Sequence, residues 1–346
     1  MIDWRSDESH VLLNPRMPQN ERRRLESFVS PLPAHVWLST SGTTGALKLV
    51  ALSKSALLAS AAAVNRRLES TERDVWCCVL PTFHVGGLGI LARAFLSGAR
   101  VVETSWDASA FASMLDITLA SLVPAQVVDL VSASLRAPAN PRAIVVGGGA
   151  LSDEIYLEAR ALGWPLLPSY GMTECCSQIA TATLESSDLV LLDHFEARVE
   201  SDGRLAFRGE SLLTGYAGDE GFVDPRVDGW FVTDDRGAIE GRVLRVHGRA
   251  SEFVKIGGES VDLARLDRIL ADISSDAAVV AMPDDRLGHA IHLAVASDDG
   301  SRIAADFNSR VFPFEHARGV HRVDAIPRTP LGKLRRAELA AQLERR

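Results

Sequence analysis

The sequence predicts an α/β protein with a large N-terminal domain, built on a helix-covered and mainly parallel sheet, and a small mobile α+β domain at the C-terminus. Three observations support this prediction. From residue 34 onward, short apolar runs alternate with segments of helix length, which favours a parallel sheet. After about residue 188, short segments separated by turns indicate a β-rich subdomain. Near residue 249, a new alternation of helices and strands begins.

The expected elements of the large domain follow from this pattern. The first 34 residues are polar and contain four prolines, so they should be irregular, with one short helix near residues 21–28. Strands are expected at residues 35–38, 75–80, 101–103, 122–123 and 143–146, and helices at 54–67 and 88–97. A loop rich in Gly, Ser and Thr should join the first strand directly to the first of these helices.

The later elements define the domain boundaries. Strands of the β-rich subdomain are expected at residues 197–200, 204–208, 229–232 and 243–246. The C-terminal part should contain helices at 262–273 and from Arg335, and strands at 277–282, 290–297 and near Val320. We therefore expect a large domain at 1–248, made of an α/β part (34–187) and a β-rich part (188–248), and a C-terminal domain at 249–346.

Composition excludes several classes of protein. The chain has 346 residues, with 37 basic and 45 acidic side chains and a formal net charge of −8. A net negative charge argues against non-specific binding of nucleic acid or of an anionic membrane. No apolar run reaches the roughly 20 residues of a membrane helix, and no secretion-signal pattern is visible. The four cysteines, Cys77-Cys78 and Cys175-Cys176, lack metal-ligand spacing, so buried reduced thiols in a cytoplasmic protein are expected.

A loop suited to phosphate binding follows the first expected strand. Its polar and small residues are Ser39, Thr40, Ser41, Gly42, Thr43, Thr44 and Gly45, followed by Lys48. Hydroxyls and a flexible backbone can surround phosphate oxygens, and lysine adds a compact positive charge. Lys48 is one of only four lysines in the chain. A flexible linker is the alternative, but the position between a strand and a helix favours a binding loop.

Four further motifs carry polar side chains at the ends of expected elements. They lie at residues 168–174, 229–235, 246–249 with 255–259, and 327–333. In the first, Glu174 suits a magnesium ion that bridges phosphate oxygens. In the second, Asp235 could accept hydrogen bonds from ribose hydroxyls, and the last presents Lys333 on a Pro/Gly loop. Considered alone, each of these four motifs could also be an ordinary solvent-exposed turn without a binding role.

Together, in this order and at these separations, the motifs resemble those of the adenylate-forming superfamily of acyl- and aryl-CoA ligases, luciferases and peptide-synthetase adenylation domains. The resemblance runs from about Ala34 to Lys333. Within it, residues 81–90 with Arg93, and residues 170–177, are most similar to the 2-succinylbenzoate–CoA ligases of menaquinone synthesis. The match to the superfamily is the more specific one. The match to this subfamily is less specific, because small aromatic-acid ligases share parts of residues 81–93 and 170–177.

The resemblance implies a role for each motif. Residues 39–48 would hold the β- and γ-phosphates of ATP, Thr173 would lie near the α-phosphate, and Glu174 would bind Mg²⁺. Asp235 would bind the ribose hydroxyls, assisted by Arg249. Gly147, Gly148, Gly149, Tyr170 and Gly171 would line the adenine and acid sites. His84 would be a catalytic residue at the acid pocket between the two half-reactions, and Arg93 is a candidate to bind a second carboxylate of the acid. Lys333 would be moved into the site for adenylation, and Lys255, Gly257 and Gly258 would line the CoA side after a domain rotation.

Three departures from the family pattern stand out. Only 38 residues precede the phosphate loop, fewer than relatives place there. The chain could be a compact variant, or it could expose apolar surface that a second copy covers in a homodimer. Ser251 occupies the position where an aspartate is expected at the hinge. Asp234 stands where many relatives have glycine. None of these changes removes a charge that adenylation requires.

The function expected is therefore an ATP- and Mg²⁺-dependent ligase that makes 2-succinylbenzoyl-CoA through an acyl-adenylate, with ATP, a small acid and CoA as its partners. Two alternatives remain open at this stage. One is a related aryl- or acyl-acid ligase, or an enzyme that loads a carrier protein instead of CoA. The other is a degenerate nucleotide-binding scaffold without activity.

Overall fold

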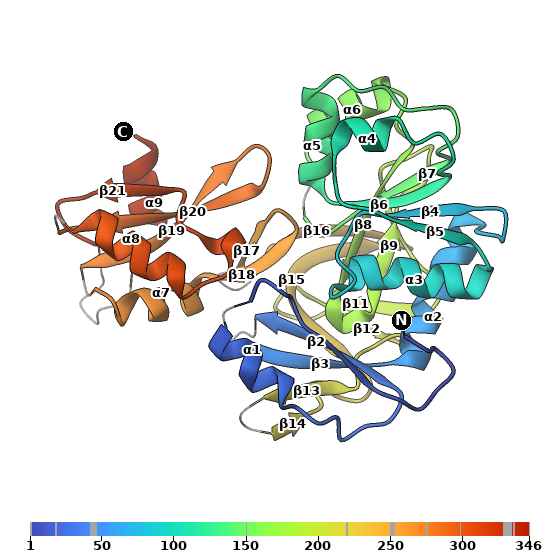
Figure 1. Cartoon of the computed structure of the whole chain (residues 1–346), viewed down its shortest axis with the longest axis horizontal. Helices are drawn as coiled ribbons and strands as arrows, with labels where there is room; N and C mark the ends of the chain where they lie inside the picture. The colour runs from blue at the N-terminus through green and yellow to red at the C-terminus, as the bar shows by residue number, and fades with distance from the viewer. Residues whose placement is uncertain are drawn as a thin grey trace. The chain divides into compact units, whose positions relative to one another are not determined.

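The computed structural model describes residues 2–17, 19–41, 47–149, 151–218, 221–249, 253–274, 276–297, 299–327, 334 and 336–345. Two compact units divide the chain (Figure 1). The first contains Met1–Leu13, Phe28–Thr40 and Lys48–Ser251, and the second contains Asn14–Ser27, Ser41–Leu47 and Glu252–Arg346.

A continuous sheet of 11 strands forms the centre of the first unit. Five strands are parallel, in the order β5 (Arg100–Glu103), β4 (Val75–Cys78), β6 (Leu119–Leu122), β7 (Ala143–Val146) and β8 (Leu166–Met172). Six antiparallel strands continue it, in the order β9 (Ser177–Thr181), β10 (Leu189–Leu191), β16 (Val243–Arg249), β15 (Phe231–Glu240), β12 (Arg204–Gly209) and β11 (Phe195–Val199). The change of direction occurs between β8 and β9.

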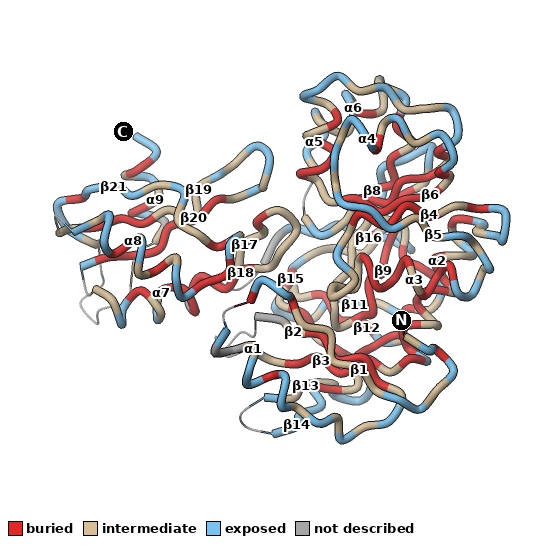
Figure 2. The backbone as a smooth tube through the Cα atoms, viewed as in Figure 1, coloured by how far each residue is buried: buried red, intermediate tan, exposed pale blue. Residues whose placement is uncertain are grey.

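Helices cover both faces of the parallel part, as short apolar strands require. On one face, α2 (Lys54–Leu68) and α3 (Val85–Ser97) pack against Trp76 and Cys78 of β4. On the other face, α4 (Ala108–Ala112), α5 (Pro124–Ser132) and α6 (Asp153–Ala161) pack against Cys77 and the alternate residues of the neighbouring strands. Strands β4, β6 and β7 are almost entirely buried (Figure 2). All four cysteines are buried and free, as expected.

A second sheet of the chain has the order β1 (His10–Leu12), β2 (His35–Ser41), β3 (Leu47–Ser53), β13 (Gly215–Gly218) and β14 (Gly221–Val223). It corrects one expectation, because the phosphate loop joins β2 to a further strand, β3, and not directly to a helix. The physical reason is the run Leu49 to Leu52, which is fully apolar and buried. Helix α2 then begins at Lys54, with Ser53 as its N-cap.

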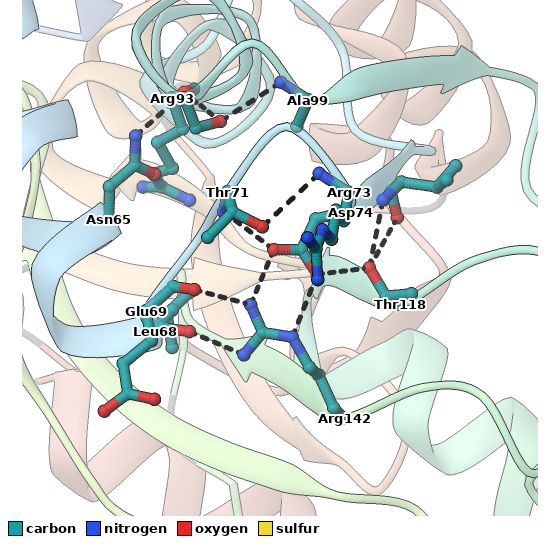
Figure 3. A network of polar contacts seen from close by, with 12 residues as sticks. Asn65, Leu68, Glu69, Thr71, Arg73, Asp74, Arg93, Ala99, Thr118 and Arg142 are labelled. Carbon is teal, nitrogen blue, oxygen red and sulfur yellow. Dashed lines mark hydrogen bonds and ion pairs between the residues drawn. The ribbon is translucent and has the colours of Figure 1, made fainter.

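The amino ends of the parallel strands are held by a polar network around Asp74 (Figure 3). The carboxylate accepts hydrogen bonds from the backbone N–H of Thr71, at 2.9 Å, and from the hydroxyl of Thr118, at 2.8 Å. Arg142 donates two more, from Nε at 2.9 Å and from Nη2 at 2.7 Å. The network ties together the segments before β4, β6 and β7. The opposite, carboxyl ends of these strands are left for the site.

The second unit contains α1 (Gln19–Glu26) and an α+β arrangement after residue 252. Its C-terminal elements are β17 (Phe253–Ile256), β18 (Glu259–Asp262), α7 (Leu263–Ala271), β19 (Ala277–Asp284), β20 (Gly288–Val295), α8 (Gly300–Ser309), β21 (Gly319–Arg322) and α9 (Arg336–Glu344). A core of its own includes Val261, Leu266 and Phe307. Within the described ranges of both units, no helix has the length and apolar character to cross a membrane.

Candidate active site

Glu174 lies in a single 3₁₀ turn, Thr173–Cys175, that follows the end of β8. Its Oε1 atom accepts a hydrogen bond from the hydroxyl of Tyr216, at 3.0 Å. Its backbone carbonyl accepts another from the N–H of Leu213, at 2.7 Å. Leu213 lies just before β13 and Tyr216 lies within it, so one distant piece of chain holds both the backbone and the side chain of Glu174. Among the described residues, Oε2 of Glu174 has no hydrogen-bond donor.

Lys48 reaches the same place from β3. Its Nζ lies over the ring of Tyr216, 5.6 Å from the ring centroid, at a distance typical of a cation–π contact. Within the described part of the chain, no carboxylate lies within ion-pair distance of Nζ. Lys48 and Glu174 are thus brought together around one tyrosine, although 126 positions (174 − 48) separate them in the sequence.

Asp235, on β15, is held in the same manner by a second tyrosine. The hydroxyl of Tyr170, from β8, donates a hydrogen bond to Oδ2 of Asp235 at 2.7 Å. The backbone N–H of Asp235 donates to the hydroxyl of Thr233 at 3.1 Å. In the pairing of β15 with β16, Asp235 stands opposite Arg249. The strand register therefore puts the backbone of Arg249 beside that of Asp235.

The carboxylates of the site raise the pKa values of two side chains, Cys175 and Tyr216. Burial raises the pKa of the Cys175 thiol, and the charges of Glu174 and Asp235 raise it further. Burial likewise raises the pKa of Tyr216, with further contributions from Glu174, Cys175 and Asp234. The negative charges of Glu174, Asp234 and Asp235 therefore act on the same group of side chains, and cations would offset them when a polyphosphate binds.

The donor set fits a magnesium ion. The described residues contain no group of three or more His, Cys, Asp or Glu side chains that could enclose a metal. Mg²⁺ is commonly held by one or two carboxylates, waters and substrate phosphates, and needs no protein cage. Oε2 of Glu174 supplies one such carboxylate oxygen, because only Oε1 is used by Tyr216.

Arg93, on α3, is a buried cation with neutral partners. Its side chain is 2% exposed and lies 5.5 Å from the ring centroid of Trp76. Its Nη1 and Nη2 atoms each lie 3.3 Å from a serine hydroxyl, in Ser121 and Ser177 respectively. Nε is buried without an acceptor, and no carboxylate within the described ranges pairs with the guanidinium. Burial lowers the pKa of Arg93 to about 10, which expresses the cost of an uncompensated charge.

A strained bend brings the Glu174 turn to Arg93. Cys176 and Ser177 have φ angles of 53° and 108°, in the left-handed region that non-glycine residues rarely adopt. A Cβ atom at Gly171 would lie 1.8 Å from the carbonyl oxygen of Ser177, so only glycine fits there. The bend ends with the Ser177 hydroxyl on Arg93, and links the expected Mg²⁺ residue to the expected acid-binding residue.

The remaining residues expected in the acid and adenine sites border these elements. His84 occupies the N-cap position of α3, nine residues before Arg93. Gly147, Gly148 and Gly149 follow β7, and Gly148 has a φ of 86°. A Cβ atom at Gly147 would lie 2.8 Å from the hydroxyl of Ser169, the residue that precedes Tyr170. The glycine loop thus lies against the strand that carries Tyr170.

Several expected residues are not placed. Gly42, Thr43, Thr44, Gly45, Ser251 and Lys333 lie outside the described residues. Ser39, Thr40 and Ser41 belong to β2, and Lys48 to β3. In the second unit, Lys255 lies on β17, and Gly257 and Gly258 form the tight turn between β17 and β18, with φ angles of 57° and 93°. Positive φ at both positions explains this glycine pair as a hairpin turn.

Four residues at the site were not predicted to have a role: Trp76, Ser121, Ser177 and Tyr216. Tyr216 could have been selected by its rarity, because the chain contains only three tyrosines, just as it contains only four lysines. Ser121 had another, as a polar residue inside an otherwise apolar strand. Neither signal shows which distant side chain the residue contacts.

Comparisons with known proteins show which family the chain belongs to. Residues 13–216, more than half of the chain, match the family model described as AMP-binding enzyme. The chain belongs to the AMP-binding enzyme family. Among the relatives of this AMP-binding enzyme, the probable 2-succinylbenzoate–CoA ligase of Mycobacterium tuberculosis is 32% identical over 87% of this chain and 82% of the relative. The 2-succinylbenzoate–CoA ligase of Staphylococcus epidermidis is 29% identical over 88% of this chain and 69% of the relative.

Solved structures show the same fold. A double mutant of o-succinylbenzoate CoA synthetase from Bacillus subtilis, bound to a product analogue, superimposes on this AMP-binding enzyme with a TM-score of 0.84. The match covers 97% of this chain and 88% of that one, at 22% identity. A malonyl-CoA ligase with methylmalonyl-CoA and AMP bound matches at 26% identity and a TM-score of 0.73, over 85% of this chain and 71% of that one. The expected α/β fold is confirmed.

Proposed function

We propose that this protein is an ATP- and Mg²⁺-dependent ligase that converts 2-succinylbenzoate to 2-succinylbenzoyl-CoA. In the first step, a carboxylate oxygen of the acid attacks the α-phosphorus of ATP, the bond to the β-phosphate breaks, and diphosphate leaves. In the second step, the CoA thiol loses its proton and its sulfur attacks the acyl carbon, and AMP leaves. The relatives at about 30% identity support this assignment by their names.

The described residues include part of the charge that the first step would need. Two anions must approach each other, so catalysis depends on alignment and on neutralisation of charge. Mg²⁺, when bound, would reduce the repulsion between the phosphates and the attacking carboxylate. Glu174 would hold the ion through Oε2, Lys48 would contact the phosphates with Thr173 beside them, and Asp235 would accept the ribose hydroxyls.

The observation that carries the proposal is the environment of Arg93. A buried guanidinium that has only hydroxyl and aromatic neighbours among the described residues is costly unless an anion joins it. 2-Succinylbenzoate has two carboxylates, and only one of them is activated. The second would pair with Arg93, which lies on α3, the helix that begins directly after His84.

Other parts of the proposal rest on the sequence. Lys333 is assigned to the adenylation step, and Lys255, with Gly257 and Gly258, to the CoA step after rotation of the C-terminal domain. CoA as the acceptor, a homodimer and a cytoplasmic location also stay predictions. A panel of acceptors and a measurement of molecular mass in solution test the first two.

An end-point assay tests the function. The purified chain is incubated with ATP, Mg²⁺, CoA and one acid from a panel of 2-succinylbenzoate, benzoate, malonate and short fatty acids, and AMP and thioester mass are measured. We expect thioester from 2-succinylbenzoate and little from the other acids. Thioester from another acid alone would keep the ligase chemistry and overturn the substrate. ATP binding without turnover of any acid would instead favour a non-catalytic nucleotide-binding protein.

Arg93→Ala tests the role of the second carboxylate. For 2-succinylbenzoate we expect kcat/KM to fall on the order of 100-fold, mostly through KM, because a buried charge pair is lost. For any monoacid that the wild-type chain accepts, kcat/KM should change much less. Equal losses with both acids would show that Arg93 acts through the fold and does not bind the substrate.

A further inference from the structure

Tyr216 stands between the two oppositely charged side chains of the phosphate site. It lies on β13, which pairs antiparallel with β3 so that Tyr216 is opposite Val50. Lys48 is two residues before Val50 and its Cγ lies 3.8 Å from the Cβ position of Gly218. Tyr216 and Lys48 are therefore diagonal neighbours on one face of the two strands. From there the phenol ring extends to Glu174.

The hydroxyl of Tyr216 acts as a fixed donor. It donates to Oε1 of Glu174 at 3.0 Å. An ionised carboxylate can only accept, so the phenol supplies the hydrogen of this contact. A hydrogen bond to one carboxylate oxygen orients the whole group and leaves the other oxygen, Oε2, for a cation.

The ring of Tyr216 contacts Lys48. The ammonium lies over the ring at 5.6 Å from its centroid, and it does not pair with Glu174, although both residues contact the same tyrosine. A direct ammonium–carboxylate pair in this half-buried place would be attractive. It would also occupy the lysine that phosphate needs and the carboxylate that the metal needs.

We propose that Tyr216 is a positioning residue that keeps Lys48 and Glu174 apart, with the lysine directed to phosphate and the carboxylate to the divalent cation. The inference rests on the proposed role of Glu174 as a ligand of Mg²⁺. The segment around Tyr216 is built for such a task. The N–H of Leu213 holds the backbone of Glu174. A Cβ atom at Gly215 would lie 2.5 Å from the ring of Phe222, so β13 is fixed closely against β14.

The test measures binding of a non-hydrolysable ATP analogue by calorimetry, with Mg²⁺ and with EDTA, so that it does not depend on turnover. Tyr216→Phe keeps the ring and loses the hydroxyl. We expect the gain in affinity caused by Mg²⁺ to fall about 10-fold, as for a lost hydrogen bond to a charged group, and the affinity in EDTA to stay within about twofold. Tyr156→Phe, on α6, is the matched control for the loss of a phenol hydroxyl and should change neither value.

Tyr216→Leu removes both functions of the side chain. In this variant we expect Lys48 to pair with Glu174, so that affinity falls in EDTA as well, by about 10-fold. Adding Glu174→Gln to Tyr216→Leu should restore most of the affinity in EDTA, because the competing carboxylate is gone. A merely structural role of Tyr216 would not produce this rescue.

The outcomes separate the two levels of the proposal. If Glu174→Gln alone leaves the Mg²⁺-dependent gain intact, Glu174 is not the metal ligand and the proposed function must be revised. If Glu174→Gln removes the gain but Tyr216→Phe does not reduce it, the positioning role is wrong. Loss of affinity in Tyr216→Leu without rescue by Glu174→Gln would overturn the separation of the two charges. Thermal unfolding of each variant checks that it is folded.

Discussion

Arg142 and Arg93 are two arginines of the same α/β layer with opposite surroundings. Arg142, at the amino end of the parallel strands, forms a bidentate pair with Asp74, whose side chain is 7% exposed. Four donors surround that carboxylate and satisfy it completely. Arg93, on α3, has two serine hydroxyls and a tryptophan ring, with Nε left over. Figure 3 shows both arginines, with Arg142 directed at Asp74.

The difference separates a structural charge from one that we assign to binding. Buried charges that serve the fold are normally paired and fully hydrogen-bonded. A buried charge with incomplete partners lowers stability unless something else compensates for it. The network of Asp74 therefore needs no ligand, whereas Arg93 is explained best by an anion that arrives with the substrate.

The largest expected effect is on folding. Arg142→Met should lower the free energy of unfolding by about 3 kcal/mol, because it leaves the buried Asp74 without its counter-ion. This value is at the lower end of the usual range, since 39% of the Arg142 side chain is exposed. Arg93→Met should leave the stability of the free protein unchanged or higher. Urea denaturation of both variants measures this, and equal destabilisation would contradict the comparison.

Lys54 sharpens the comparison as a third buried cation. Its Nζ, at the start of α2, donates to the carbonyl oxygens of Asp3 and Ser6 at 2.6 and 2.9 Å, and to the Ser6 hydroxyl at 3.1 Å. Neutral partners suffice here because all three donors are used. Lys54→Met should therefore destabilise the protein by about 2 kcal/mol, unlike Arg93→Met. Urea denaturation and limited proteolysis of the N-terminal segment check this, and an unchanged midpoint would contradict it.

The smallest expected effect is a pH dependence of stability. Burial opposes ionisation of Asp74, but hydrogen bonds from Arg142, Thr71 and Thr118 outweigh it and hold its pKa below the usual range of an aspartate. A carboxyl whose pKa is lower in the folded state contributes stability above its unfolded pKa and loses it as pH falls through the folded pKa. The free energy of unfolding should therefore decrease below about pH 4, and less steeply in Asp74→Asn. Identical slopes in both proteins between pH 5 and pH 3 would refute this.

Most of the fold could be predicted because its signals are local. Apolar runs such as residues 143–146 match the strand β7 residue for residue. Strand β3 was missed because its apolar run continues without a turn signal into the Ala-rich helix α2, so the two elements were merged. Only pairing with β13, more than 160 residues later, shows that this run is a strand.

The site was predictable in its motifs but not in its contacts. Glu174 and Asp235 stood out as carboxylates that follow turns, and the structure holds each with a tyrosine. The tyrosines come from other segments, so periodicity and spacing could not pair them. The neutral surroundings of Arg93 also require tertiary structure, because a serine in β6 and another after the Glu174 turn meet only in the folded chain.

The continuous sheet has a consequence for cooperativity. Because β8 pairs with β9 and β9 with β10, the parallel and antiparallel parts of the first unit share backbone hydrogen bonds across their junction. Neither part can open there without breaking the ladder of the other. We expect the amides of β8 and β9 to exchange with solvent only through the highest-energy opening of this unit, as one foldon. The carboxylate turn that follows β8 would then owe its rigidity to the whole sheet.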